Sequence, residues 1–197
     1  MRKSIKHKRD EDAFTKAQTN LKVLSILEEE KVLDLYFFDE SYFSLIPMVP
    51  YAWQEKGNTI AVPSVRGGYL SVAGFLSKTN KSAMYIIDNA TLNSEKLIEI
   101  FDDFCSQIVR KTVVTLDNAP IHTSKIFQAK IEEWRNKGLI LFFIPSYSPE
   151  LNLIEILWKK IKYEWIPFKA YENHKALKNE LETILGAIGT KLYIHFT

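Results

Sequence analysis

Two dense apolar segments, each followed directly by an aspartate, constrain the fold of this chain more than any other feature. Residues 33–38 precede Asp39, and residues 111–116 precede Asp117. Such segments are typical of strands that are buried on both faces, as in α/β proteins. Ligands of α/β sheets bind beyond the carboxyl ends of the strands. We therefore expect both aspartates just past the ends of core strands, and side by side if those strands are neighbours.

The rest of the chain predicts a mixed α/β sheet with helices on both faces. Strands are expected at 33–38, 59–64, 69–77, 84–87, 111–116 and 139–144, with turn chemistry at 66–68. Apolar residues at helical spacing predict helices near 9–30, 94–108, 127–137, 154–166 and 173–188. The early strands suggest an antiparallel meander, and the later alternation of strands and helices predicts parallel strands.

Length and composition predict one globular domain without a membrane segment. The chain has 197 residues, of which 46% are hydrophobic, enough for one sizeable core. Its longest apolar run, 139–144, is far shorter than the ~20 residues that cross a bilayer. The basic N-terminus lacks the apolar core of a secretory signal, so we expect a cytoplasmic protein. The single cysteine, Cys105, is expected to be a buried space-filler.

Charge is informative only locally, because the net charge of +2 does not by itself indicate a nucleic-acid binder. One basic cluster lies at the N-terminus and consists of Arg2, Lys3, Lys6, His7, Lys8 and Arg9. Another lies beside Glu155 and consists of Lys159, Lys160 and Lys162. Each cluster either meets phosphates or forms a solvated or disordered surface.

Glu155 is a third acidic candidate, at the first turn of the helix predicted after the loop 145–152. Three carboxylates can hold two Mg²⁺ ions about 4 Å apart across a scissile phosphate, where one ion activates the attacking oxygen and the other stabilises the leaving oxygen. The residues alone leave other interpretations open. Aspartates after strands often form turns or cap helices, and Glu155 can pair with Lys159 one helical turn away.

Three sequence blocks, in this order and spacing, carry a family resemblance: 35–44 (LYFFDESYFS), 116–122 (LDNAPIH) and 145–158 (PSYSPELNLIEILW). From about residue 33 to the end, the chain resembles the mariner superfamily of DDE transposases, in particular its bacterial insertion-sequence branch. The resemblance implies a ribonuclease-H-like mixed sheet, with three antiparallel strands followed by parallel strands. It also implies a DDE catalytic domain over 31–197, and the residues before it, 1–30, are expected to form a basic segment and lead-in helix.

Carried over residue by residue, the resemblance implies that Asp39, Asp117 and Glu155 are the catalytic metal ligands, for two Mg²⁺ ions with Mn²⁺ as a substitute. The implied activity is that of a DNA transposase catalytic domain, with metal-dependent cleavage of DNA ends followed by strand transfer. Asn118 and His122 then orient Asp117, touch a phosphate, or serve the start of a helix.

A second matching segment contains Pro50, Trp53 and Gly57, in which Trp53 packs in a hairpin or contacts DNA. The chain also departs from the family pattern. The interval from Asp117 to Glu155 is 155 − 117 = 38 positions, slightly longer than usual, and Leu153 replaces a common proline. Asp88 repeats the Asp-Asn-Ala tripeptide of Asp117, but the family has no ligand there, so we exclude it.

The partners implied by the resemblance are DNA, both transposon ends and target, and a second copy of the chain in a homodimer. Only about thirty residues precede the first strand. We therefore expect the helix-turn-helix reader of such enzymes to be encoded separately, or this chain to be a truncated or processed copy. The expected location is the prokaryotic cytoplasm, in association with the nucleoid. Two alternatives are a catalytically silent, DNA-binding or regulatory transposase remnant and a ribonuclease-H-like nuclease.

Overall fold

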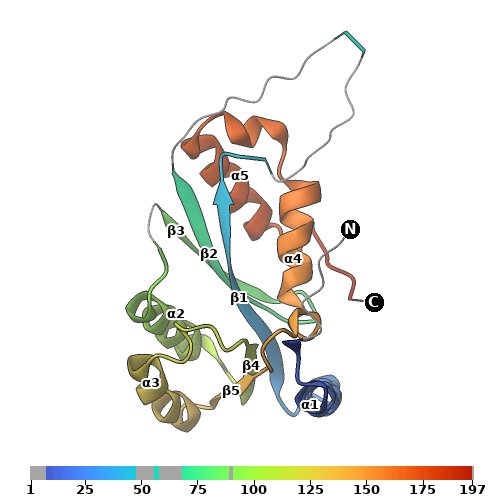
Figure 1. Ribbon diagram of the computed structural model, residues 1–197, viewed down its shortest axis with the longest axis vertical. Coiled ribbons are helices and arrows are strands. Elements are labelled where there is room, and N and C mark those ends of the chain that lie inside the picture. Colours follow the sequence, from blue (N-terminus) through green and yellow to red (C-terminus); the bar gives the residue numbers. More distant parts are fainter. Residues whose placement is uncertain (1–7, 48–55, 58–67, 89–90, 197) are drawn as a thin grey trace.

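A computed structural model describes residues 8–47, 56–57, 68–88 and 91–196. Its five strands form one mixed sheet in the order β3-β2-β1-β4-β5 (Figure 1). The strands are β1 (Asp34–Ser44), β2 (Tyr69–Leu76), β3 (Ser82–Asp88), β4 (Thr112–Leu116) and β5 (Leu139–Phe143). Strands β1, β2 and β3 are antiparallel, whereas β4 pairs in parallel with both β1 and β5. The predicted change from antiparallel to parallel strands is confirmed, and β1 and β4 are neighbours.

The prediction that the first strand ends before Asp39 was wrong. Strand β1 continues to Ser44 and pairs with β2 as far as the Ser44–Tyr69 partners. Beyond Glu40 its residues alternate between buried and exposed, with Ser41 and Phe43 buried. Such alternation is typical of an antiparallel strand with one covered face. Asp39 therefore lies inside a long strand. The predicted strand at 59–64 lies outside the described residues.

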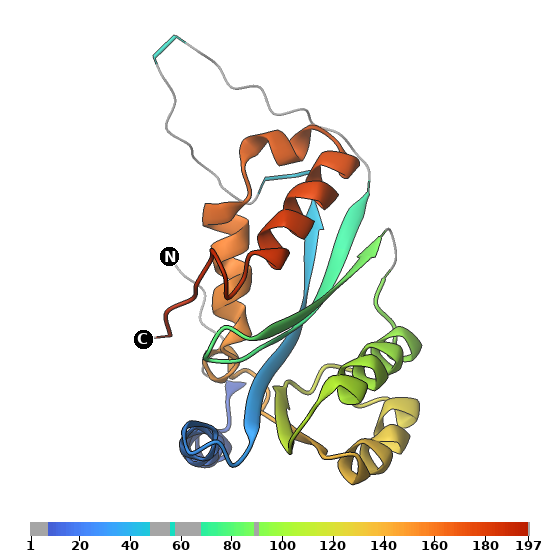
Figure 2. The same ribbon diagram turned by 180° about the vertical axis from the view of Figure 1, so that it is seen from behind.

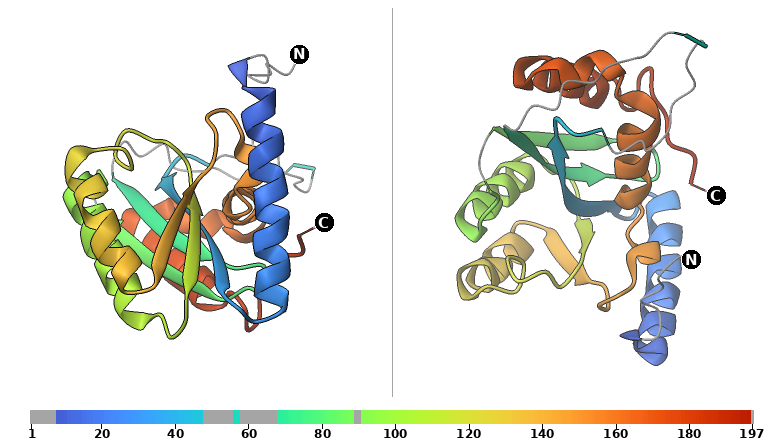
Figure 3. Two further views of the ribbon diagram at one scale, coloured as in Figure 1. Left: turned by 90° about the horizontal axis from the view of Figure 1, so that it is seen from below. Right: turned by 45° about the horizontal axis from the view of Figure 1, so that its top comes forward.

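Helices cover both faces of the sheet, as predicted (Figure 3). One face carries α1 (Glu11–Glu29), α4 (Ile154–Lys160) and α5 (His174–Gly186), and the other carries α2 (Ser94–Gln107) and α3 (Lys125–Asn136). Seen from behind, α5 crosses the upper part of β1 and β2 (Figure 2). Shorter helical turns are η2 (Pro149–Leu151), η3 (Ile161–Trp165) and η4 (Phe168–Glu172). Within the described ranges, no helix is both long and apolar enough to span a membrane.

Four of the helices begin where the sequence provides a capping side chain. Each cap accepts a hydrogen bond from the backbone N–H three residues later; the caps are Asp10, Asn93, Ser124 and Asn173. Such a cap stabilises a helix by about 1 kcal/mol. Helix α4 instead has no capping side chain and follows the turn η2 by two residues. Its start is therefore fixed by the loop that precedes it.

Alternate side chains of β1 divide the interior into two cores. Leu35 and Phe37 face α1, α4 and α5, whereas Phe38 faces α2 and α3. The second core is largely aromatic and includes Phe75 stacked on Phe104, with ring centroids 3.9 Å apart. Cys105 is buried in this core, as predicted. Both faces of the sheet are thus covered, and the polar groups of β1 stand out against an apolar background.

Candidate functional site

Asp39 and Asp117 occupy equivalent places at the point where two parallel strands part. The last paired residues of β1 and β4 are Phe37 and Thr115. Asp39 lies two residues beyond Phe37, and Asp117 lies two residues beyond Thr115. Because side chains alternate with a period of two, Asp39 keeps the face of Phe37, which is the α4 side of the sheet.

Glu155 approaches the two aspartates from above this face. It is the second residue of α4, as predicted, and the loop before that helix is tied to the sheet. Asn152 is buried, and its Nδ2 donates a hydrogen bond of 2.9 Å to the backbone oxygen of Phe38. Asp39, Asp117 and Glu155 line one hollow of about 390 Å³, together with residues of the loop 144–152. The structure thus brings the three predicted site residues to one place.

A glycine in β2 allows α4 to pack this closely. Gly74 is the partner of Asp39 in the antiparallel register. A Cβ atom at this position would lie 2.6 Å from Met84 Sδ and 3.0 Å from the Trp158 ring. The space left by the glycine accommodates the indole of Trp158, whose Nε1 donates to Asp39 Oδ2 at 3.1 Å. One carboxylate oxygen of Asp39 is therefore held by α4.

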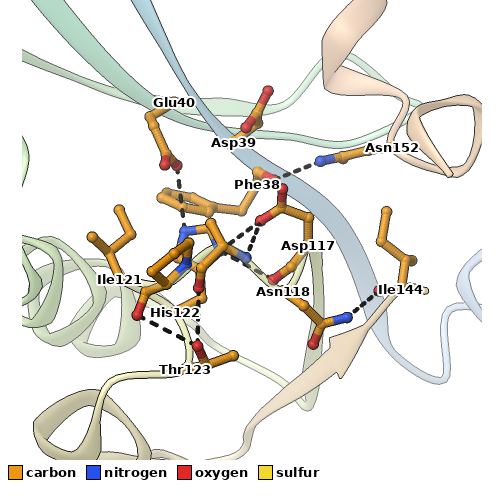
Figure 4. Close-up of polar contacts among 12 residues, drawn as sticks. Phe38, Asp39, Glu40, Asp117, Asn118, Ile121, His122, Thr123, Ile144 and Asn152 are labelled. Carbon is orange, nitrogen blue, oxygen red and sulfur yellow. Dashed lines mark hydrogen bonds and ion pairs between the residues drawn. The ribbon is translucent and has the colours of Figure 1, made fainter. Parts of the chain in front are cut away.

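Asp117 is held from the opposite side by a buried histidine (Figure 4). His122 Nδ1 lies 2.8 Å from Asp117 Oδ1, and the backbone N–H of Ala119 donates to the same oxygen at 2.9 Å. The second ring nitrogen, Nε2, lies 3.3 Å from Glu40 Oε2 in an ion pair, without the alignment of a hydrogen bond. His122 is 1% exposed. Of its three predicted roles, the geometry matches orientation of Asp117.

The cluster of Asp39, Asp117, Glu155 and Glu40 carries excess negative charge. Burial raises the pKa of Asp39 to about 8, helped by the charges of Glu40, Asp117 and Glu155. Burial also raises the pKa of Glu155, although Lys159 opposes the shift. The hydrogen bond from His122 instead lowers the pKa of Asp117. The strands thus bring these carboxylates together, and burial favours the protonated form of Asp39.

His122 carries positive charge at neutral pH. Burial by itself lowers the pKa of this imidazole, but the hydrogen bond to Asp117 and the contact with Glu40 outweigh burial and raise the pKa to about 10. The ring thus offsets part of the negative charge at Asp117 and Glu40.

The donor set fits a hard divalent cation. Such ions prefer oxygen ligands, and carboxylates above all. Within the described part of the chain, Asp117 Oδ2 has no hydrogen bond, and Asn152 Oδ1 is buried without a partner. In the same part of the chain, no group of three Asp, Glu, His or Cys side chains is arranged closely enough to hold a metal ion. Ligation by all three carboxylates therefore requires side-chain movement.

A second hollow, of about 240 Å³, lies on the other side of Asp39 and Glu155. Lys159 and Lys162 line it. Lys162 is half-buried and its Nζ lies 5.2 Å from the Phe43 ring centroid; burial lowers its pKa, against the opposing charges of Asp39 and Glu155. Lys160 instead pairs with Glu164 at 2.7 Å. The basic cluster predicted beside Glu155 is thus divided, and two of its lysines flank the carboxylates.

The N-terminal basic cluster is only partly described. Arg2, Lys3, Lys6 and His7 lie outside the described residues. Arg9 has a side chain that is 9% exposed, pairs with Glu11 and Glu150 at 2.9 and 3.1 Å, and stacks on Phe14. Arg9 therefore ties the start of α1 to the loop before α4. Lys8 also lies near this loop, with its Nζ 5.8 Å from the Tyr147 ring centroid.

The remaining predicted residues do not enter the site. Asp88 ends the edge strand β3, which β2 separates from β1. Pro50 and Trp53 lie outside the described residues, and Gly57 adopts a left-handed φ of 97°. Sequence reasoning missed Glu40, Tyr147 and Asn152 as site residues, although all three lie within the quoted sequence blocks. A larger hollow of about 490 Å³ beside α1 has mainly apolar walls and contains none of the three carboxylates.

Comparison with known proteins gives one family and one fold. Residues 34–178 match the family model of the DDE superfamily endonucleases. Among solved structures, the chain is similar to the Mos1 mariner transposase in a paired-end complex with Mn, at a TM-score of 0.61 and 15% identity, covering 95% of this chain and 59% of that chain. For the Mos1 strand transfer complex the TM-score is 0.62 at 15% identity, covering 95% of this chain and 58% of that chain.

For the Mos1 catalytic domain by itself, the TM-score is 0.57 at 13% identity, covering 90% of this chain and 82% of that chain. These similarities identify the ribonuclease-H-like fold. The chain spans slightly less than three fifths of the Mos1 chain in the complexes. Among curated protein sequences, no relative matches this chain.

Proposed function

Because this chain belongs to the DDE superfamily of endonucleases, we propose that it is the catalytic domain of a DNA transposase that cleaves transposon ends and joins them to target DNA. The observation that carries this proposal is the convergence of Asp39, Asp117 and Glu155 on one hollow where β1 and β4 part. We assign metal ligation to these three residues. The catalytic unit is 31–197, and residues 1–30 form its basic segment and lead-in helix.

The residues of the hollow have separate roles in the proposed reaction. Asp39, Asp117 and Glu155 hold two Mg²⁺ ions, which supply an activated nucleophile and charge stabilisation for phosphoryl transfer. Trp158 holds Asp39 at one oxygen, and His122 holds Asp117 at one oxygen. Each aspartate thus keeps its other oxygen for a cation. No covalent intermediate with the protein is required, because water or a 3′-hydroxyl attacks the phosphate directly.

The DNA backbone lies across the two hollows on either side of Asp39 and Glu155. Lys159 projects from α4, one turn beyond Glu155, and Lys162 projects from the following turn η3; both line the second hollow. A phosphate there meets cations while its neighbour reaches the carboxylates. The wider proposal is an insertion-sequence enzyme that acts as a homodimer, in prokaryotic cytoplasm at the nucleoid, with a separately encoded helix-turn-helix reader.

The proposal is tested by incubating the chain with supercoiled and linear DNA, with and without Mg²⁺ or Mn²⁺. The expected result is nicking of DNA and joining of 3′ ends that depend on the metal. A parallel substrate panel with RNA–DNA hybrids distinguishes a transposase from a ribonuclease-H-like nuclease. Binding of DNA without any metal-dependent product, under conditions in which Mn²⁺ also fails to bind, would assign the chain to the catalytically silent class.

Replacing Lys162 is expected to weaken DNA binding more than replacing a lysine elsewhere. Lys162→Gln removes one cation from the second hollow, so the slope of log affinity against log salt concentration is expected to fall by about one. The matched control is Lys137→Gln, on α3 beyond the opposite face of the sheet, where Lys137 pairs with Glu133 at 2.6 Å. Equal salt slopes for both variants, measured by fluorescence anisotropy, would remove Lys162 from the interface.

Tyr147 is expected to contribute a stacking surface beside the carboxylates. It lines the hollow, is 44% exposed, and has a left-handed φ of 60°. That backbone conformation destabilises a residue other than glycine by about 1 to 2 kcal/mol. Tyr147→Asn, which tolerates this conformation, is therefore expected to retain its melting temperature. Its DNA affinity is expected to fall about 5- to 100-fold, the range for loss of one stacked base.

Two control variants accompany the Tyr147 measurement. Tyr147→Phe keeps the ring and should bind DNA like the unsubstituted protein. Tyr193→Asn removes a similarly exposed ring, 52% exposed, near the C-terminal end. A lowered melting temperature with unchanged DNA affinity in Tyr147→Asn would show a structural role for Tyr147.

A further inference from the structure

Side chains continue the sheet beyond the point where backbone pairing stops. Between β4 and β5, Asn118 Nδ2 donates to the backbone oxygen of Ile144 at 2.6 Å. Between β1 and the loop before α4, Asn152 makes the corresponding bond to Phe38. Between β1 and β4, paired backbone residues end at Phe37 and Thr115. Polar side chains thus fasten the segment after β4 to Ile144 and the middle of β1 to the loop before α4.

The fastening between β1 and β4 is a chain of three side chains, Glu40, His122 and Asp117. The His122 ring spans the gap, with Nδ1 2.8 Å from Asp117 and Nε2 3.3 Å from Glu40. Figure 4 shows this bridge passing beneath β1, on the side away from the Asp39 carboxylate. Because Glu40 directly follows Asp39 on the same strand, the bridge joins the backbone positions of two proposed ligands.

The histidine at the centre of this bridge has little freedom to turn. Its ring lies between Phe38 and Phe127, with centroid separations of 5.8 and 6.1 Å. Its backbone oxygen accepts a hydrogen bond of 2.8 Å from Gln128 Nε2 on α3. The ring is therefore fixed by α3 and by the aromatic core, and both of its nitrogens face carboxylates. Fixed groups of this kind orient metal ligands in proteins.

We propose that Glu40 and His122 are positioning residues that form a strut between β1 and β4 and set the separation of the Asp39 and Asp117 carboxylates. This role rests on the proposed function, because it concerns two proposed metal ligands. The strut lies just beyond the last backbone pair of β1 and β4. The distance between the two strands at the site therefore depends on the lengths of the Glu40 and His122 side chains. Glu40 lines the second hollow but not the hollow that contains Asp117, and its contact with Asp117 runs only through His122. It acts through the histidine.

Variants that change either the length or the charge of the Glu40 side chain distinguish a strut from a purely electrostatic role. Glu40→Asp keeps the negative charge but shortens the side chain by one methylene, so the strut no longer reaches His122 at its present length. Glu40→Gln keeps the length and removes the charge. If only charge matters, Glu40→Asp should bind metal like the unsubstituted protein. If reach matters, Glu40→Asp should weaken binding even though its charge is intact.

The test measures Mn²⁺ affinity by the electron paramagnetic resonance signal of the free ion, alongside melting temperature in EDTA. Loss of a group that orients a ligand weakens metal affinity about 10- to 100-fold, and we expect this range for Glu40→Asp and His122→Asn. The double variant is expected to be no weaker than His122→Asn, because both changes break one strut. The matched control, Glu164→Asp, changes an exposed glutamate that pairs with Lys160 and should leave the affinity unchanged.

The outcomes separate the strut from the function on which it rests. Wild-type Mn²⁺ affinity in Glu40→Asp, or additive losses in the double variant, would overturn the strut and leave the proposed function intact. Absence of Mn²⁺ binding by the unsubstituted protein would overturn the proposed function and the strut with it. Should His122→Asn unfold in EDTA, the comparison of Glu40→Asp with Glu164→Asp still decides the question.

Discussion

Asp117→Asn is expected to reduce Mn²⁺-dependent DNA cleavage about 10³-fold or more, without loss of fold or of DNA binding. Metal ions stabilise charge in such reactions by several kcal/mol, and each 1.36 kcal/mol is about tenfold in rate. Asparagine keeps an oxygen where Asp117 Oδ1 accepts from His122 and Ala119. Its amide nitrogen replaces Oδ2, which is the oxygen proposed for the cation. The substitution therefore removes a ligand and retains the local hydrogen bonds.

The matched control for this prediction is Asp88→Asn. Asp88 begins the same Asp-Asn-Ala tripeptide as Asp117 and also ends a strand. Strand β3, however, is the edge strand, and β2 lies between it and β1. Cleavage of plasmid DNA, followed on gels over a range of Mn²⁺ concentrations, should be normal in Asp88→Asn. Normal cleavage by Asp117→Asn would contradict the assignment of Asp117 as a ligand.

Much of the fold was predictable because it depends on local periodicity. The apolar segments before Asp39 and Asp117 identified β1 and β4, and apolar residues at helical spacing identified the helices. The end of β1 was not predictable in this way. Whether a chain continues as a strand beyond Asp39 depends on β2, which lies about thirty residues further along the sequence. Periodicity assigns a residue to a face, but only the partner strand determines where pairing stops.

The candidate site shows the same division between local and distant information. Family resemblance placed all three carboxylates, and the structure brings them to one hollow. It offered His122 as one residue that orients Asp117, but it did not identify Glu40, Trp158 or Asn152. Glu40 meets His122 across 82 residues of sequence, since 122 − 40 = 82, and Asn152 meets Phe38 across 114 residues. The roles of these residues arise from the topology, which places the middle of β1 and the end of β4 next to the loop before α4.

Raising the pH from about 4 to about 8 is expected to destabilise the metal-free protein, and Asp39→Asn is expected to remove most of this effect. Burial raises the pKa of Asp39 from 3.8 to about 8. Between these values the folded protein holds a proton that the unfolded chain has released, so stability falls as the pH rises and levels off above the folded pKa. Each tenfold difference in proton affinity is about 1.36 kcal/mol, so ionised Asp39 opposes folding by on the order of 5 kcal/mol.

Asparagine mimics the protonated carboxyl group and still accepts the hydrogen bond from Trp158, so Asp39→Asn should melt at a higher temperature than the unsubstituted protein above pH ~8. His122 acts in the same direction at higher pH, since its pKa is raised to about 10 and its stabilisation is lost as the pH rises through that value. The contribution of Asp39 is therefore given by the difference in melting temperature between the two proteins at each pH, and not by the pH dependence of either protein alone.

Mn²⁺ should narrow the difference in stability between the two proteins. The ion binds the ionised carboxylate, so its affinity for the unsubstituted protein rises with pH up to about 8 and binding releases a proton. At a hundred times its dissociation constant, a ligand stabilises the folded state by about 2.7 kcal/mol. Mn²⁺ should stabilise Asp39→Asn only slightly, because this variant lacks the carboxylate that binds the ion. The same loss of the ligand should abolish its cleavage activity. Parallel melting curves of the two proteins across the pH series, in EDTA and in Mn²⁺, would mean that Asp39 neither holds the proton nor binds the ion.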